Sequence, residues 1–256
     1  MHLHHVSDGA GPDVVVLHGL FGAGGNLGAL SRHLAPHYRV HSLDLPDHGR
    51  SDWTEEPSIP SYAAAVWAWV EQQGLSSVRL VGHSLGGKVA MQLALDYPQQ
   101  VNGLVVADIA PVAYPPSHHS VFAGLRAVAQ AAPENRAAAR VLMAPHIEES
   151  MVIQFLLLSL ARGDDGLYRW RFNAAGLERG YASLLQPPTG PAAPVPALFI
   201  AGELSDYRVT QHSDAISDLY PNSAITTMAG CGHWLHAQEP ALFNDHVNRF
   251  LAQLSA

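Results

Sequence analysis

Cysteine is almost absent from this 256-residue chain: Cys231 is the only one, so no disulfide can form within the chain. A single thiol gives no sign of an oxidising compartment. The first residues, MHLHHVSDGAGPD, lack the basic start and the long apolar run of a secretory signal. The longest apolar stretches, such as Met151–Leu160, are too short to span a bilayer. These absences favour a cytoplasmic protein with no membrane span.

Positive charge is also scarce. Lys88 is the only lysine, and 14 basic residues stand against 22 acidic ones, which gives a formal net charge of −8. Binding to a nucleic-acid backbone requires clustered Lys and Arg side chains, and the sequence contains no basic run. We therefore expect no nucleic-acid partner.

Metal-binding motifs are missing although the chain has 16 histidines. Neither an H-E-x-x-H helix pattern nor paired C-x-x-C spacing occurs. The histidines at positions 2, 4 and 5 adjoin strand-like residues, and those at 118 and 119 lie in a proline-rich stretch. We expect neither a metal ion nor another cofactor.

What the sequence does contain is a regular alternation of short apolar runs and helical patterns. Most of the runs are almost continuously apolar, as buried parallel strands are. Strand and helix in alternation predict an α/β fold: a mostly parallel central sheet covered by helices on both faces. The expected strands are Val14–Leu17, Val40–Leu43, Val78–Val81, Leu104–Ala107, Ala197–Ile200 and Ala224–Met228. The expected helices are Leu27–Leu34, Tyr62–Gln73 with Ser61 as N-cap, Leu85–Asp96, Gln211–Leu219 and Ala241–Leu254.

The alternation is interrupted between residues 111 and 191, where the sequence shows only helical patterns. Proline-rich segments, PVAYPP and PPTGPAAPVP, open and close this stretch. A helical insertion of this kind is best placed over the carboxyl ends of the strands, where ligands of α/β sheets bind. We expect residues 1–110 and 192–256 to form the core and residues 111–191 to form a helical cap. Its expected helices are His119–Gln130, Glu134–Leu142, Ile147–Ala161 and Leu177–Leu185.

A serine lies in a glycine-rich corner between an expected strand and helix, in the sequence GHSLG at Gly82–Gly86. A sharp strand-to-helix turn strains the backbone at its central residue and requires small neighbours. Such a turn exposes the hydroxyl of Ser84 above the amino end of the helix, where developing negative charge is favoured. We interpret Ser84 as a nucleophile; the alternative is a serine that serves only the turn.

A serine needs a base to become a nucleophile, and His233 is the best candidate. It follows the last expected strand in a glycine-rich loop, Gly230–His233, which can hold the imidazole over the sheet edge. The alternative is an ordinary loop histidine. We expect His236 to be a packing residue and Cys231 to be a small loop residue without a thiolate role.

Backbone amides are expected to bind the oxyanion that forms when a serine attacks a carbonyl group. The residue after the nucleophile supplies one donor, which here is Leu85. The loop after the first central strand, His18–Gly25, should supply the other from Leu20, with Phe21 beside it. The same loop partly matches a dinucleotide fingerprint, but Leu27 stands where that pattern needs its third glycine, which argues against nucleotide binding.

Four motifs together resemble the α/β-hydrolase superfamily: HGLFG at 18–22, DLPDHGRSD at 44–52, GHSLGG at 82–87 and GHW at 232–234. VVADIAPVAY at 105–114 and YRWRFN at 168–173 look like the small YbfF-type esterase branch. The resemblance implies a serine hydrolase of small to medium acyl esters or thioesters that uses a Ser-His-Asp triad, an acyl-enzyme and no cofactor. Two alternatives are a non-catalytic ligand-binding protein on the same fold and a C–C bond hydrolase. The DLPDHGRSD segment is expected to form a structural turn, with Gly49 at its bend.

Two carboxylates compete to be the acid of the triad. In many members of the superfamily the acid is the fourth residue of a G-x-x-D turn; here that turn reads GELSD, so Ser205 holds the slot and Asp206 comes one residue late. Asp108 ends another strand in a DIAP context that resembles the esterase branch. We favour Asp108 and keep Asp206 as the alternative.

The underside of the cap is expected to hold the acyl group of a small-molecule ester. The alternative is that the apolar residues of the cap only fill its interior, since amphipathic helices must bury an apolar stripe. The sequence leaves the oligomeric state open. The candidate lining residues are Phe21, Phe122, Leu125, Phe155, Leu156, Leu157 and Leu184.

Overall fold

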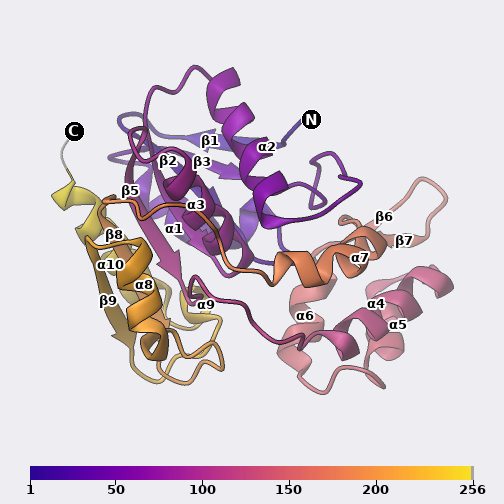
Figure 1. Ribbon diagram of the computed structural model, residues 1–256. Coiled ribbons are helices and arrows are strands. Elements are labelled where there is room, and N and C mark those ends of the chain that lie inside the picture. The colour runs from indigo at the N-terminus through magenta and orange to yellow at the C-terminus, as the bar shows by residue number, and fades with distance from the viewer. Residues whose placement is uncertain (255–256) are drawn as a thin grey trace.

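A computed structural model describes residues 1–254 of the chain (Figure 1). In this range one sheet has the strand order β1-β3-β2-β4-β5-β8-β9. Strand β1 pairs antiparallel with β3, and the other neighbours are parallel. All the expected strands are present, whereas β1 was not foreseen. The strands are β1 His5–Asp8, β2 Asp13–Leu17, β3 Arg39–Leu43, β4 Val78–His83, β5 Val101–Ala107, β8 Ala197–Gly202 and β9 Ser223–Met228.

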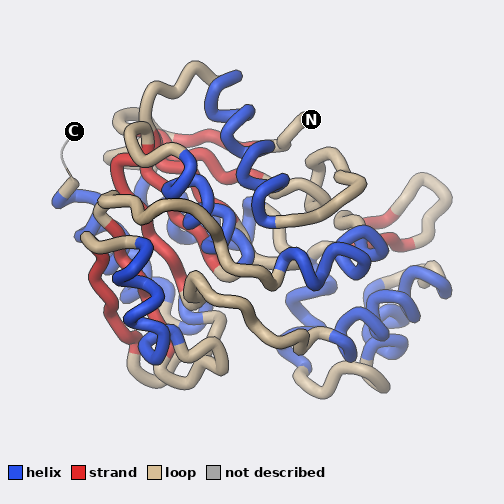
Figure 2. The backbone as a smooth tube through the Cα atoms, viewed as in Figure 1, coloured by secondary structure: helices blue, strands red, loops and turns tan. Residues whose placement is uncertain are grey.

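Both faces of the sheet are covered by helices, as the almost continuously apolar strands predict. Val14 and Val16 of β2 belong to one buried cluster, together with residues of α1 and α10. Val15 and Leu17 belong to the other, together with residues of α2, α3 and α8. The predicted α/β fold is thereby confirmed (Figure 2). The helices of this part are α1 Gly28–Leu34, α2 Ile59–Gln72, α3 Leu85–Asp96, α8 Ser213–Leu219, α9 Leu235–Gln238 and α10 Pro240–Gln253, with short 3-10 helices at Gly24–Leu27 and Val209–His212.

Helix α2 begins three residues before the predicted position. Its N-cap is Ser58, whose hydroxyl accepts a hydrogen bond from the backbone of Ser61, while the Ser61 hydroxyl bonds back to Ser58. Pro60 fits the first turn because its missing N–H would have no helical partner there. The expected cap at Ser61 was therefore wrong: Ser61 is the third helical residue of a capping box.

The segment between β5 and β8 forms a second lobe beside the sheet (Figure 1). Four helices occur near the predicted positions. The third is shorter than predicted, because Leu160 and Ala161 belong to the strand β6 of a small antiparallel hairpin, β6–β7, which was not predicted. Its strands have three residues each, too few for a periodic pattern, and the intervening loop contains Gly166 at φ 83°. The proposed limits of the cap, 111 and 191, stay a prediction. The elements are α4 His119–Ala131, α5 Arg136–Met143, α6 Ser150–Leu158, β6 Leu160–Arg162, β7 Tyr168–Trp170 and α7 Ala174–Leu184.

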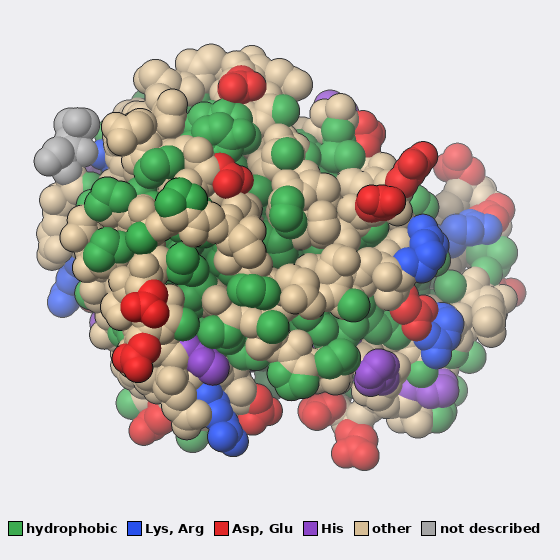
Figure 3. Space-filling model, viewed as in Figure 1, with side chains coloured by type: hydrophobic (Ala, Val, Ile, Leu, Met, Phe, Trp, Pro, Cys, Tyr) green, Lys and Arg blue, Asp and Glu red, His purple; other side chains and the backbone are tan. Residues whose placement is uncertain are grey.

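The surface carries charges of both signs. On the face in Figure 3, basic side chains lie in small groups interspersed with acidic ones and form no continuous stripe. Within residues 1–254, none of the helices combines the length and the apolar character that a bilayer crossing requires.

Candidate active site

The serine corner has the geometry that its glycines predict. Ser84 follows β4 directly and is the N-cap of α3, with φ 54° and ψ −118°. A β-carbon on Gly82 would lie 2.2 Å from the carbonyl oxygen of Gly86, and one on Gly86 would lie 2.4 Å from that of Leu17. Larger residues at either glycine would therefore push the turn apart. The strained backbone places the Ser84 hydroxyl at the wall of a cavity.

His233 lies over the same sheet edge and is bonded to Asp108. Its Nδ1 is 2.7 Å from Oδ2 of Asp108, which is fully buried at the end of β5. The Asp108 carboxylate also accepts the backbone N–H of Gly202 at 2.8 Å and the hydroxyl of Ser205. Asp206 is exposed and, within the described residues, makes no hydrogen bond to His233. Of the two candidate acids, Asp108 is the one in contact with the imidazole.

Ser205 occupies the fourth position of the turn after β8, where a G-x-x-D turn would carry an acid. This serine is buried, and its hydroxyl donates to the same oxygen of Asp108 that contacts His233. Ser205 therefore stands where that turn would carry the acid, one residue before Asp206, and it supports the Asp108 carboxylate at the end of the neighbouring strand β5.

Two further histidines, His83 and His236, lie close to His233. The Nε2–H of His83 donates to the backbone carbonyl of His233 at 2.9 Å, and the rings of His83 and His236 are 4.4 Å apart. Burial holds the pKa of His83 well below its usual value and lowers the pKa of His236 to about 4. Both rings are therefore neutral near pH 7 and position the His233 loop without adding charge. The ring of His236 contacts those of His83 and Phe243 and also lines the cavity, so its expected role in packing stays a prediction.

Tyr207 is a site residue that the sequence reading missed. Its ring stacks on that of His233 at 4.3 Å, and its backbone carbonyl accepts the hydroxyl of Tyr114 at 3.1 Å. Burial raises the pKa of the Tyr207 phenol, and a hydrogen bond with Ser84 opposes the rise. A neutral phenol thus lies beside both Ser84 and His233. A tyrosine in a loop carries no motif, so no sequence signal could have singled it out.

The loop after β2 passes directly under the serine corner. A β-carbon on Gly19 would lie 3.3 Å from Cβ of Ser84. The backbone N–H groups of Leu20 and Leu85 find no acceptor within residues 1–254, whereas the N–H of Phe21 donates to His48 at 3.1 Å. Leu20 and Leu85, but not Phe21, thus keep a backbone N–H without an acceptor in the described residues.

The DLPDHGRSD segment accepts hydrogen bonds from the backbone of the loop after β2. Asp44 accepts the backbone N–H groups of Gly24 and Arg50 at 2.7 and 2.9 Å. Gly49 has φ 58°, and a β-carbon there would collide with the Asp44 carboxylate at 2.1 Å. The Asp44 side chain thus serves backbone hydrogen bonds within and beside the turn, which agrees with the expected structural turn.

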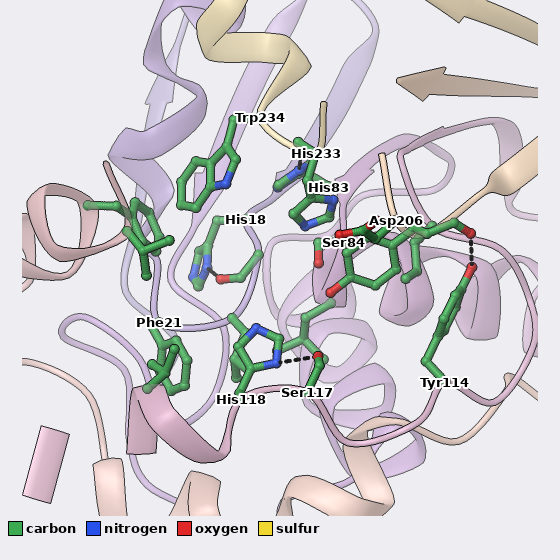
Figure 4. A pocket seen from close by; sticks show the side chains of 18 of the residues that line it. His18, Phe21, His83, Ser84, Tyr114, Ser117, His118, Asp206, His233 and Trp234 are labelled. Atoms are coloured by element: carbon green, nitrogen blue, oxygen red, sulfur yellow. Dashed lines mark hydrogen bonds between the residues drawn. The ribbon is translucent and has the colours of Figure 1, made fainter. Parts of the chain in front are cut away.

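A cavity of about 640 Å³ lies between the core and the second lobe, with Ser84 and His233 in its wall. Phe21, Phe155, Leu156 and Leu184 line it as expected. Figure 4 shows Phe21 beside this cavity, with Ser84 and His233. In that view Trp234 and Phe21 lie across the cavity from Asp206. Much of the remaining lining is apolar and includes Ile109, Val121, Met151 and Val152.

Phe122, Leu125 and Leu157 do not line this cavity, contrary to expectation. Phe122 packs edge-on against Phe21 and Tyr181, with ring centroids 5.4 and 5.1 Å apart. Leu125 is fully buried and Leu157 nearly so, within the apolar core of the lobe. Periodicity identified these residues as buried but not which buried surface they contact.

The chain is similar to known protein families and structures. Residues 12–240 match the family described as the alpha/beta hydrolase fold. The chain is similar to a putative esterase/lipase of Haemophilus influenzae, with 36% identity over 94% of this chain and 83% of the relative. It is 34% identical to esterase YbfF of Escherichia coli, over 93% of this chain and 92% of the relative.

A mouse relative and a solved structure agree with these matches. The sn-1-specific diacylglycerol lipase ABHD11 of Mus musculus is 34% identical over 94% of this chain and 81% of its own length. A marine microorganism esterase superposes with a TM-score of 0.93 and 33% identity, over 97% of this chain and 98% of that one. The chain belongs to the alpha/beta hydrolase fold family.

Proposed function

We propose that this protein is a serine hydrolase that cleaves carboxylic esters or thioesters of small to medium acyl groups. The observation that carries the proposal is the His233–Asp108 hydrogen bond beside a serine held at a strained corner. The relatives named esterase and lipase support the same activity.

The proposed reaction proceeds through an acyl-enzyme. Ser84 Oγ attacks the carbonyl carbon while Nε2 of His233 takes the hydroxyl proton, and Asp108 holds the ring through Nδ1–H. The N–H groups of Leu20 and Leu85 donate to the oxyanion. His233 then gives its proton to the leaving alkoxide or thiolate. Water repeats the sequence on the acyl-enzyme, which releases the acid and restores the Ser84 hydroxyl.

A fluorophosphonate probe followed by peptide mass spectrometry tests this assignment, and the chain supplies an internal control. Ser7 is bonded to Nδ1 of His41 at 2.7 Å, and Nε2 of His41 is 2.8 Å from Asp13. In this second Ser-His-Asp set, Ser7 lies on the ordinary strand β1, His41 on β3 and Asp13 on β2, and Ser7 is not held at a strained corner. We expect the probe to label Ser84 and not Ser7. Labelling of Ser7, or of neither serine, would overturn the proposal.

We further propose that residues 111–191 act as a cap whose cavity receives the acyl group. Val152 of α6 lines the cavity, while Leu158 on the same helix is 66% exposed and does not. In Val152→Phe the added bulk should lower kcat/KM for p-nitrophenyl octanoate about tenfold relative to the acetate.

The matched control is Leu158→Phe, which introduces the same side chain outside the cavity and should leave the octanoate-to-acetate ratio unchanged. Equal efficiency of the wild-type protein on acyl chains of all lengths would contradict a defined acyl cavity.

A further inference from the structure

The only lysine of the chain is buried within the helix that follows the nucleophile. Lys88 lies on α3, four residues after Ser84, and is 2% exposed. No carboxylate lies within ion-pair distance of its ammonium in the described residues. A buried charge without an opposite charge is costly unless hydrogen bonds satisfy all of its donors.

Three backbone carbonyls satisfy the Lys88 ammonium. Its Nζ donates to Val112 at 2.9 Å, to Leu185 at 2.5 Å and to Gln186 at 2.8 Å. Val112 lies where the chain enters the cap, and Leu185 and Gln186 lie where it leaves. One side chain therefore holds both connections of the cap against the nucleophile helix.

The chemistry of these acceptors explains why a cation is used. Leu185 is the C-cap of α7, and the end of a helix leaves carbonyls without helical partners at the negative end of the helix dipole. Three converging carbonyls require three N–H donors, which an ammonium has and a neutral amine lacks. Burial opposes the charge and lowers the pKa of Lys88 to about 7.

The same junction extends to the proposed catalytic groups. Tyr114, on the entering connection, donates its backbone N–H to Leu185 at 3.3 Å, and its ring lies 5.2 Å from Nζ of Lys88. Its hydroxyl donates to the carbonyl of Tyr207, whose ring stacks on His233. A shift of the two connections would therefore move the loop beside Ser84 as well as the cap.

We propose that Lys88 is a positioning residue that fixes the cap over Ser84 by tying both cap connections to α3. This inference rests on the proposed ester hydrolysis. Loss of the ammonium leaves the three carbonyls without their donor, so the cap and its acyl cavity shift relative to the serine. Long acyl groups, which must fill the cavity, lose more than an acetyl group does.

Lys88→Met tests the proposal, because methionine fills a similar volume without donors. We expect KM for p-nitrophenyl octanoate to rise and the octanoate-to-acetate ratio of kcat/KM to fall about tenfold, as for other losses of substrate positioning. Limited proteolysis should cut the connections near residues 112 and 186 faster than in the wild-type protein.

Gln92 supplies the matched control, one helical turn further along α3. Its side chain exchanges two hydrogen bonds with the backbone of Thr189, both 2.9 Å, and so binds only the leaving connection. Gln92→Met should keep the octanoate-to-acetate ratio of the wild-type protein. An equal fall in both variants, or no fall in Lys88→Met, would overturn the proposal.

A measurement on the wild-type protein is independent of variant folding and of ester hydrolysis. Because the chain has one lysine, 15N-lysine labelling gives a single Nζ resonance. At pH 6 we expect an ammonium whose protons exchange slowly and whose shift differs from that in urea. An exposed, rapidly exchanging ammonium would refute the junction itself. If the probe does not label Ser84 but the Nζ protons of Lys88 exchange slowly, the junction stands and only the proposed ester hydrolysis is refuted.

Discussion

Replacing Ser84 with alanine is expected to lower kcat for p-nitrophenyl ester hydrolysis by on the order of a million-fold. The variant keeps the cavity and the free N–H groups of Leu20 and Leu85 but has no atom that can form the acyl-enzyme. Initial rates at saturating ester, with the wild-type protein diluted to match, measure the loss.

The control for this variant is Ser7→Ala, which removes the serine of the other Ser-His-Asp chain and should retain wild-type turnover. Because Ser84 and His233 act as one unit, His233→Ala should cost almost as much, and the double variant little more. Residual turnover close to that of the wild-type protein in a folded Ser84→Ala variant would exclude Ser84 as the nucleophile.

Asp108→Asn is expected to lower kcat about ten-thousand-fold, while Asp206→Asn stays close to the wild-type rate. The amide of asparagine can present an N–H to Nδ1 of His233, which favours the ring tautomer whose Nε2 carries a proton and cannot accept one from Ser84. Asp206 is exposed, so its replacement leaves the hydrogen bond between His233 and Asp108 in place.

Thermal unfolding of both variants separates this effect from misfolding, since Asp108 also accepts bonds from Gly202 and Ser205. An asparagine can still accept from Gly202, so we expect Asp108→Asn to fold. A folded pair in which Asp206→Asn is inactive and Asp108→Asn is active would transfer the role of the acid to Asp206.

Much of the fold and part of the site could be predicted because local chemistry specifies them. Buried parallel strands are apolar on both faces, and the Ser84 corner needs small residues at Gly82 and Gly86, so both features leave clear sequence patterns. The preference for Asp108 over Asp206 came from a resemblance, and the contact with His233 agrees with it.

What the sequence did not predict depends on contacts between distant segments. Tyr207 reaches His233 from another loop, and Phe122 turns towards Phe21 and Tyr181 instead of the cavity. A helical period indicates that a side chain is buried but not what it is buried against. Lys88 is a similar case, because its three acceptors lie 24, 97 and 98 positions away in the chain.

The bond between Ser205 and Asp108 has a consequence for finding such a site from a sequence motif. Strands β5 and β8 are neighbours in the sheet, so their carboxyl ends present two adjacent positions to one histidine. The carboxylate at the end of β5 contacts the imidazole, and the hydroxyl in the turn after β8 donates to that carboxylate, so the two strand ends hold His233 together. A motif search that demands an acid at the fourth position of the turn after β8 would discard this chain, although the imidazole still meets a carboxylate from the adjacent strand.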